Sequence, residues 1–177
     1  MTRPRAVLIG LPGAGKSTTG RRLAKILAVD FADSDDLVEQ TAGVSVREIF
    51  DGRGEPAFRE LEADAVALAL GSFDGVLALG GGALTLERTR EAVRDSGAPV
   101  VLLRASVATL TERVGPAESR PLLAGDPQAR LAELARERDE TYRAMAGLTV
   151  DTDGRTPSQV AATIAARIHD LAHRADR

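Results

Sequence analysis

The stretch that decides the fold is Gly10-Leu11-Pro12-Gly13-Ala14-Gly15-Lys16-Ser17-Thr18, which matches the pattern G-x-x-x-x-G-K-[ST] at every fixed position. An apolar run at 6–9 precedes it and a helical pattern follows it. In such a strand–loop–helix unit, backbone N–H groups and the positive end of the helix cradle a polyphosphate. Lys16 reaches the β/γ-phosphates, and the Ser17 hydroxyl ligates Mg²⁺. The stretch therefore predicts that residues 13–18 bind a nucleoside triphosphate.

Length and composition favour one ordinary globular domain. The 177 residues carry a net charge of −3, which argues against a nucleic-acid surface as the main partner. The absence of cysteine excludes disulfides, thiolate metal sites and cysteine catalysis. No apolar run approaches the ~20 residues that span a membrane, and residues 1–5 lack the features of a signal peptide. We expect a cytoplasmic protein without a membrane partner, and we expect a monomer.

Apolar strand patterns alternate with helical patterns along the chain. Several strands are apolar on both faces, which is typical of a parallel sheet covered by helices on two sides, with ligands at the carboxyl ends of the strands. A capping box at Ser45 to Glu48 predicts a short helix, and Thr85 is predicted to cap another. In the helix predicted over 55–70, Phe58, Leu61, Ala65 and Leu68 form the expected apolar face. Strands are expected at 6–9, 28–32, 76–79, 99–103 and 148–150.

Two further stretches are expected at the edge of the sheet that holds the phosphate loop. Asp33 and Asp35 end the second predicted strand, two residues apart, so strand periodicity points both to one side. One could hold hydrated Mg²⁺ and the other could accept a proton from an attacking hydroxyl. The alternative is that this acidic run merely caps a helix. The second stretch, Gly80-Gly81-Gly82, follows a buried strand, and three glycines there would let an acceptor lie against the backbone.

Arginine supplies 21 of the 23 basic residues, so a single arginine is weak evidence for anion binding. Arg59 lies three residues before Glu62, and an ion pair between them would aim the guanidinium. Arg120 lies in a Gly- and Pro-rich segment, 115–126, that we predict to be a mobile lid. Arg143 follows Tyr142 late in a long helix. Each of these arginines taken alone is as consistent with a surface charge as with a binding role.

Taken together, these residues resemble the shikimate kinase family. The resemblance covers nearly the whole chain in the right order. It rests on the phosphate loop, Asp33-Ser34-Asp35, Phe58-Arg59-Glu60-Leu61-Glu62, Leu79-Gly80-Gly81-Gly82, Arg120-Pro121-Leu122-Leu123 and Tyr142-Arg143.

The resemblance implies transfer of the ATP γ-phosphate to the 3-hydroxyl of shikimate, in the pathway to aromatic amino acids. It implies one kinase domain over 1–177 with a nucleoside-monophosphate-kinase-like fold, a central five-stranded parallel sheet, acceptor-binding helices at about 35–70 and a lid at about 115–126. For the acceptor, the resemblance implies that Asp35 contacts the shikimate hydroxyls and serves as the base or orients them, that Arg59 and Arg143 hold the carboxylate, and that Gly80, Gly81 and Gly82 line the ring. For the nucleotide, it implies that Asp33 joins Ser17 at Mg²⁺ and that Arg120 comes from the lid. It also implies that Arg113 and Arg155 flank adenine.

Two other functions remain open on the sequence. One is a related kinase for gluconate or a nucleoside monophosphate, against which the Asp-x-Asp and triple-glycine set argues. The other is a regulatory protein that binds a nucleotide through its phosphate loop without transferring phosphate. An assay of ADP release across acceptors separates all three.

Overall fold

The computed structural model describes residues 2–114 and 125–175, and it contains one sheet of five parallel strands. The strands run in the order β2-β3-β1-β4-β5. This confirms the parallel sheet expected from the sequence. Most of the expected lid, including Arg120, lies outside the described residues. The strands are β1 (Ala6–Ile9), β2 (Asp30–Asp33), β3 (Gly75–Ala78), β4 (Val100–Arg104) and β5 (Leu148–Asp151).

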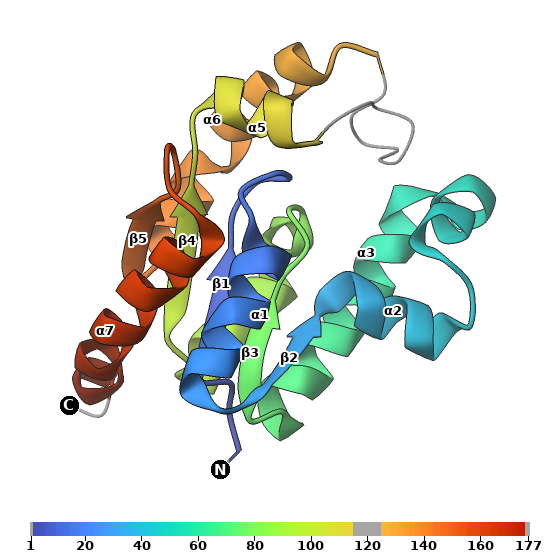
Figure 1. Ribbon diagram of the computed structural model, residues 1–177. Coiled ribbons are helices and arrows are strands. Elements are labelled where there is room, and N and C mark those ends of the chain that lie inside the picture. The colour runs from blue at the N-terminus through green and yellow to red at the C-terminus, as the bar shows by residue number, and fades with distance from the viewer. Residues whose placement is uncertain (1, 115–124, 176–177) are drawn as a thin grey trace.

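Helices cover both faces of this sheet, so the fold is a three-layer α/β sandwich (Figure 1). Helices α1 and α7 lie together on the near face in Figure 1, and α3 and α4 pack on the far face. A 3₁₀ turn over Ala83–Thr85 follows β3. The helices are α1 (Lys16–Leu27), α2 (Ser34–Ala42), α3 (Val46–Ser72), α4 (Glu87–Ser96), α5 (Val107–Val114), α6 (Pro127–Met145) and α7 (Pro157–Ala175).

The core lies on both sides of the sheet because successive strand residues point to opposite faces. In β1, Ala6 and Leu8 pack in one cluster and Val7 and Ile9 in the other. All four residues are at most 1% exposed. The uninterrupted apolar run before the phosphate loop is therefore the central strand of the sheet, and it anchors that loop rigidly.

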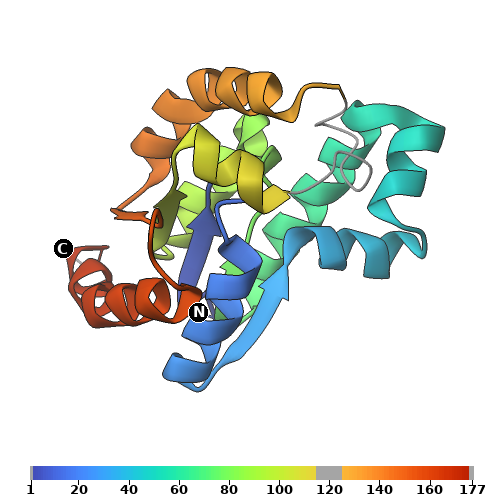
Figure 2. The ribbon, with the colours of Figure 1, turned by 45° about the horizontal axis from the view of Figure 1, so that its top comes forward.

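The strand order brings three loops to one edge of the sheet. Strand β3 pairs with both β1 and β2, with Ala78 opposite Leu8 on one side and opposite Asp33 on the other. The residues after β3 therefore lie between the phosphate loop and the end of β2. Figure 2 shows α2 and the first part of α3 on one side of this edge, and α5 and α6 on the other.

Helix α3 begins as predicted and then departs from the prediction. The capping box is present, with Ser45 accepting from the Glu48 N–H, and Gly54 breaks the helix with φ 79°. The predicted apolar face is wrong at Leu68, which is 72% exposed. Phe58 is buried as predicted, and Leu61 and Ala65 pack against the same small cluster. The buried face also carries Arg59 and Glu62, which hydrophobicity alone did not assign to it because both are charged.

Thr85 does not cap the next helix, contrary to the prediction. Its backbone N–H donates to the Gly82 carbonyl and closes the 3₁₀ turn, and its hydroxyl donates to the same carbonyl. Helix α4 begins two residues later without a capping side chain.

Among the described residues, no helix combines the length and apolarity needed to cross a membrane.

Helix α1 packs closely on the sheet because residue 20 is glycine. A Cβ atom there would lie 2.4 Å from Phe31 Cε2 and 3.2 Å from Leu8 Cδ1. We expect Gly20→Ala to lower the free energy of unfolding by about 1–3 kcal/mol through overpacking, although alanine favours helix. The matched control is Gly71→Ala in α3, where a Cβ meets nothing within 4 Å. This control should gain up to about 1 kcal/mol. Urea denaturation compares the two, and stabilisation of both variants would contradict the packing argument.

Candidate active site

One cavity of about 830 Å³ opens at the carboxyl ends of the strands. It joins the phosphate loop at one end to the α2–α3 region at the other, so two reactants could lie side by side in it. Its lining includes Gly13 to Thr18, Asp33, Asp35, Arg59, Gly80, Gly81, Gly82, Arg113, Arg138 and Arg155. Most of the candidate residues from the sequence are therefore brought together, and Arg143 is not among them.

The phosphate loop has the backbone that its sequence predicts. Gly13 and Gly15 have φ of 83° and 90°, a region that side chains rarely tolerate. Gly15 is the N-cap of α1 and has no side chain to occupy the first-turn N–H groups, which suits them to an anion. The Lys16 ammonium donates to the carbonyls of Gly10 and Leu11 at 2.7 and 3.0 Å, at the mouth of the loop.

Asp33 links the phosphate loop to α2. The Ser17 hydroxyl donates to one of its carboxylate oxygens at 2.6 Å, and the other oxygen accepts from the Asp35 N–H at 3.1 Å. Asp33 is thus the N-cap of α2, so the helix-cap alternative is correct for this residue. A hydroxyl and one carboxylate are oxygen donors of the kind Mg²⁺ takes when phosphates and water complete its shell. Among the described residues, no cluster of three acidic, histidine or cysteine side chains offers a fuller metal site.

Asp35 lies in the first turn of α2 and lines the same cavity as Asp33. Strand periodicity is not what brings the two carboxylates together, since a helix begins between them. Burial raises the pKa of Asp35 to about 6, and repulsion from Glu62 and Asp33 adds to this rise. Lys16 and Arg59 oppose it by attraction. A carboxyl group with this pKa is still ionised at neutral pH and accepts a proton more readily than an exposed aspartate.

Arg59 is held by two carboxylates. Its guanidinium donates to Glu62 at 2.6 Å and to Glu55 at 3.1 Å. The Arg59 side chain is 7% exposed and that of Glu62 is 1% exposed. The ion pair expected from the spacing of Arg59 and Glu62 is therefore confirmed, and it lies on the buried face of α3.

Sequence analysis missed Ser34 as a site residue. The buried Ser34 hydroxyl donates to Glu62 at 3.0 Å and accepts from the Gly80 N–H at 2.8 Å. It connects the start of α2, the buried face of α3 and the loop after β3. Its place between Asp33 and Asp35 was the only available signal, and serine is too common at helix starts to make that signal specific.

The triple glycine is required by neighbouring side chains. A Cβ at Gly80 would lie 2.3 Å from Glu62 Oε1, and one at Gly82 would lie 2.2 Å from Arg59 Nη2. A Cβ at Gly81 would lie 2.9 Å from Pro12 Cδ. None of the three has a positive φ, so closeness of packing rather than backbone freedom selects glycine here.

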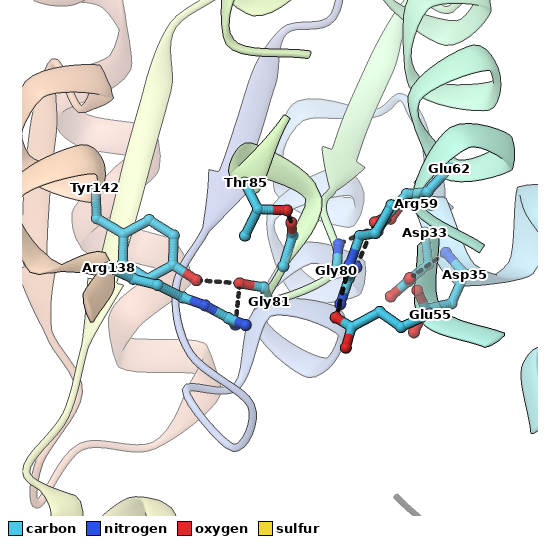
Figure 3. A network of polar contacts seen from close by, with 12 residues as sticks. Asp33, Asp35, Glu55, Arg59, Glu62, Gly80, Gly81, Thr85, Arg138 and Tyr142 are labelled. Carbon is cyan, nitrogen blue, oxygen red and sulfur yellow. Dashed lines mark hydrogen bonds and ion pairs between the residues drawn. The ribbon is translucent and has the colours of Figure 1, made fainter. Parts of the chain in front are cut away.

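The placement of Arg143 in the site is wrong. Its side chain is 64% exposed and pairs with Asp139 at 3.0 Å. Arg138 lines the cavity instead and, together with Tyr142, donates to the Gly81 carbonyl (Figure 3). Residues four apart on a helix share a face, whereas residue 143 lies about 100° further around from residue 142. The sequence pattern therefore identified the correct helix and the wrong arginine.

Arg113 and Arg155 both line the end of the cavity near the phosphate loop. The Arg113 guanidinium donates to the hydroxyl and the carbonyl of Thr152, each at 2.9 Å. That of Arg155 donates to the Asp151 carbonyl at 3.3 Å. Backbone carbonyls therefore fix both guanidinium groups at this rim of the cavity.

The cavity as a whole offers an anion-binding loop at one end. At the other end it offers the carboxylate of Asp35 and the two buried guanidinium groups of Arg59 and Arg138.

Comparison with known proteins places this geometry in a family. The family model for shikimate kinase matches residues 12–169. A shikimate kinase of Rhodococcus erythropolis is 46% identical over 95% of this chain and 99% of its own length. One of Thermobifida fusca is 51% identical over 93% of this chain and 94% of its own length.

Solved structures agree with the sequence relatives. The shikimate kinase of Acinetobacter baumannii in complex with shikimate superposes with a TM-score of 0.90 at 33% identity, covering 96% of this chain and 94% of that one. A gluconokinase of Sinorhizobium meliloti, at 18% identity and a TM-score of 0.59, shares the fold alone. With a family model that spans most of its length and relatives near half identity, the chain belongs to the shikimate kinase family.

Proposed function

We propose that this protein transfers the γ-phosphate of ATP to the 3-hydroxyl of shikimate, giving shikimate 3-phosphate and ADP. The observation that carries the proposal is the lining of the large cavity. Asp35 lines it together with the phosphate loop and the two buried guanidinium groups of Arg59 and Arg138. A small monoanion with vicinal hydroxyls needs one hydroxyl acceptor and a carboxylate clamp, and this end of the cavity supplies both.

The nucleotide end of the cavity follows from the phosphate loop. First-turn N–H groups of α1 and the Lys16 ammonium would bind the phosphates, with Gly13 to Thr18 wrapping them. Arg113 and Arg155, fixed at the rim, would flank the adenine ring. Ser17 and Asp33 would hold Mg²⁺, which when bound neutralises phosphate charge.

The remaining cavity residues would bind the acceptor. Asp35 would orient the attacking hydroxyl and accept its proton, a role that the raised pKa suits. Arg59 and Arg138 would bind the carboxylate through planar forks. Gly80, Gly81 and Gly82 would line the ring, since their lack of side chains leaves the backbone open. The expectations of a monomer, of a cytoplasmic location and of a role for Arg120 stay predictions.

An acceptor panel tests the proposal directly. We expect ADP release from ATP and Mg²⁺ to depend on shikimate, with little release on gluconate or nucleoside monophosphates. The reason is that relatives named shikimate kinase are 46% and 51% identical to this chain, whereas the gluconokinase structure shares the fold at 18% identity. Tight nucleotide binding without acceptor-dependent ADP formation would show a regulatory protein instead.

Asp35→Asn should retain nucleotide affinity and lose turnover by about 10²–10⁴-fold, because the amide cannot take a proton. In the wild type, turnover per bound acceptor should fall as the pH drops below about 6, where Asp35 becomes protonated. Initial rates at saturating ATP over pH 5–8, in buffers of constant ionic strength, give the profile. Surviving turnover with lost ATP affinity would instead assign Asp35 to the metal.

The same variant should be more stable than the wild type at neutral pH. A carboxyl whose folded pKa is raised contributes stability below its unfolded pKa and loses it as the pH rises through about 6. We expect the gain in unfolding free energy from Asp35→Asn to be about 1–3 kcal/mol larger at pH 7.5 than at pH 4. Chemical denaturation at the two pH values measures this difference, and a gain independent of pH would exclude the buried charge as its cause.

Arg138 and Arg143 provide a matched pair for the carboxylate clamp. Arg138→Lys should weaken shikimate binding by roughly 10- to 150-fold, the worth of a charge-assisted hydrogen bond, because an ammonium lacks the planar fork. Arg143→Lys, on an exposed side chain paired with Asp139, should change it less than about 2-fold. Calorimetric titration with shikimate compares the two. The reverse ranking would restore Arg143 to the site.

A further inference from the structure

Two side chains of helix α6 donate hydrogen bonds to the same backbone carbonyl oxygen. Arg138 and Tyr142 are four residues apart, so they share one face of the helix. Both donate to the carbonyl oxygen of Gly81, as Figure 3 shows. A carbonyl oxygen has two lone pairs and can serve both donors at once. The direction of this carbonyl and the position of the Arg138 guanidinium are therefore linked.

Gly81 has little room to change this arrangement. A Cβ at this residue would lie 2.9 Å from Pro12 Cδ and 3.4 Å from Arg138 Nη1. The preceding residue, Gly80, is held through its N–H by Ser34. The Gly81 peptide is therefore packed between the phosphate loop and α6, and its carbonyl gives the guanidinium a fixed point of attachment.

Tyr142 reaches the acceptor site only through these partners. Arg138 lines both the large cavity and a second cavity of about 250 Å³ behind it. Tyr142 lines only the second cavity. An acceptor in the large cavity would contact Arg138 and not the tyrosine hydroxyl. Any influence of that hydroxyl on the acceptor must therefore pass through Gly81 and Arg138.

The environment of Tyr142 keeps its hydroxyl a donor. The residue is 6% exposed, and its ring packs in the core cluster on the far face of the sheet. Burial raises the pKa of Tyr142, so the hydroxyl stays protonated at physiological pH. A phenylalanine would fill the same ring space, and the hydroxyl is therefore separable from the packing of the ring.

We propose that Tyr142 is a positioning residue of the acceptor site, which holds the Arg138 guanidinium toward the acceptor carboxylate by sharing the Gly81 carbonyl with it. The inference rests on the proposed function, in which Arg138 binds that carboxylate. Without the Tyr142 hydroxyl, one lone pair of the Gly81 carbonyl oxygen has no donor. The Arg138 guanidinium can then rotate to donate to that lone pair, which moves it toward the second cavity. Arg138 would then bind the carboxylate less well, although its charge is unchanged.

The test is Tyr142→Phe in the full chain, with shikimate affinity measured by calorimetry. We expect the Kd for shikimate to rise about 3- to 10-fold, the range for loss of one neutral hydrogen bond, with ATP affinity unchanged. The effect should disappear for the carboxamide of shikimate, which offers no charge to Arg138. Unchanged shikimate affinity overturns the proposal, and so does an equal loss for acid and carboxamide, which marks a merely structural effect.

Thr85→Val is the matched control. Its hydroxyl donates to the Gly82 carbonyl, the next carbonyl in the same loop, and the residue is exposed. It removes a comparable hydrogen bond without touching Arg138, so we expect shikimate affinity like that of the wild type. A loss equal to that of Tyr142→Phe would overturn the proposal, because any loosening of the loop would then suffice.

A spectroscopic measurement keeps the proposal testable if Tyr142→Phe fails to fold. The chain has one tyrosine and no tryptophan, so tyrosine emission reports on Tyr142 alone. Shikimate should change this emission in the wild type with the calorimetric Kd, and the carboxamide should change it much less. Absence of any change on shikimate binding overturns the inference. A wild type that neither binds nor phosphorylates shikimate overturns the proposed function instead.

Discussion

The buried ion pair between Arg59 and Glu62 is the interaction on which the proposed acceptor site depends. Removing two charges from water is costly unless each is paired and its remaining hydrogen-bonding groups are satisfied. Glu62 meets this condition by accepting from Arg59 at 2.6 Å and from Ser34 at 3.0 Å. Ser34 in turn accepts from the Gly80 N–H. The pair therefore fixes α3, the start of α2 and the loop after β3 relative to one another.

The same pair shapes both the surface and the electrostatics of the cavity. Because Glu62 and Arg59 pass directly beside the loop, a side chain at Gly80 or Gly82 would overlap them. The loop must consist of glycine there, and its backbone is left open to the cavity. Glu62 also repels the Asp35 carboxylate, which adds to the effect of burial on its pKa. One structural ion pair thereby defines a neutral wall and helps to tune the group expected to accept a proton.

The sequence by itself determined the features that depend on neighbours along the chain. The phosphate loop was predictable because its glycines meet a local backbone requirement, at φ of 83° and 90° for Gly13 and Gly15. The helix start at Ser45 was predictable because its capping side chain contacts the N–H group of the residue three positions later. The Arg59–Glu62 pair belongs to the same class, since it spans a single helical turn. Apolar runs likewise indicated the parallel strands.

Only the tertiary structure decided which distant residues meet. The order of the strands places the loop after β3 beside both the phosphate loop and Asp33, and through it Ser34 meets Gly80 from 46 residues away. It also selects Arg138 over Arg143, because the contact of α6 with Gly81 sets which face of that helix is turned inward. On α3, Leu68 is exposed and Glu62 is buried, the reverse of what hydrophobicity assigns to these two residues. The physical reason is common to all three: a polar group is buried where a partner on another element compensates it, as Gly80 does for Ser34, Gly81 for Arg138 and Ser34 for Glu62. Such a partner is not visible in the local sequence.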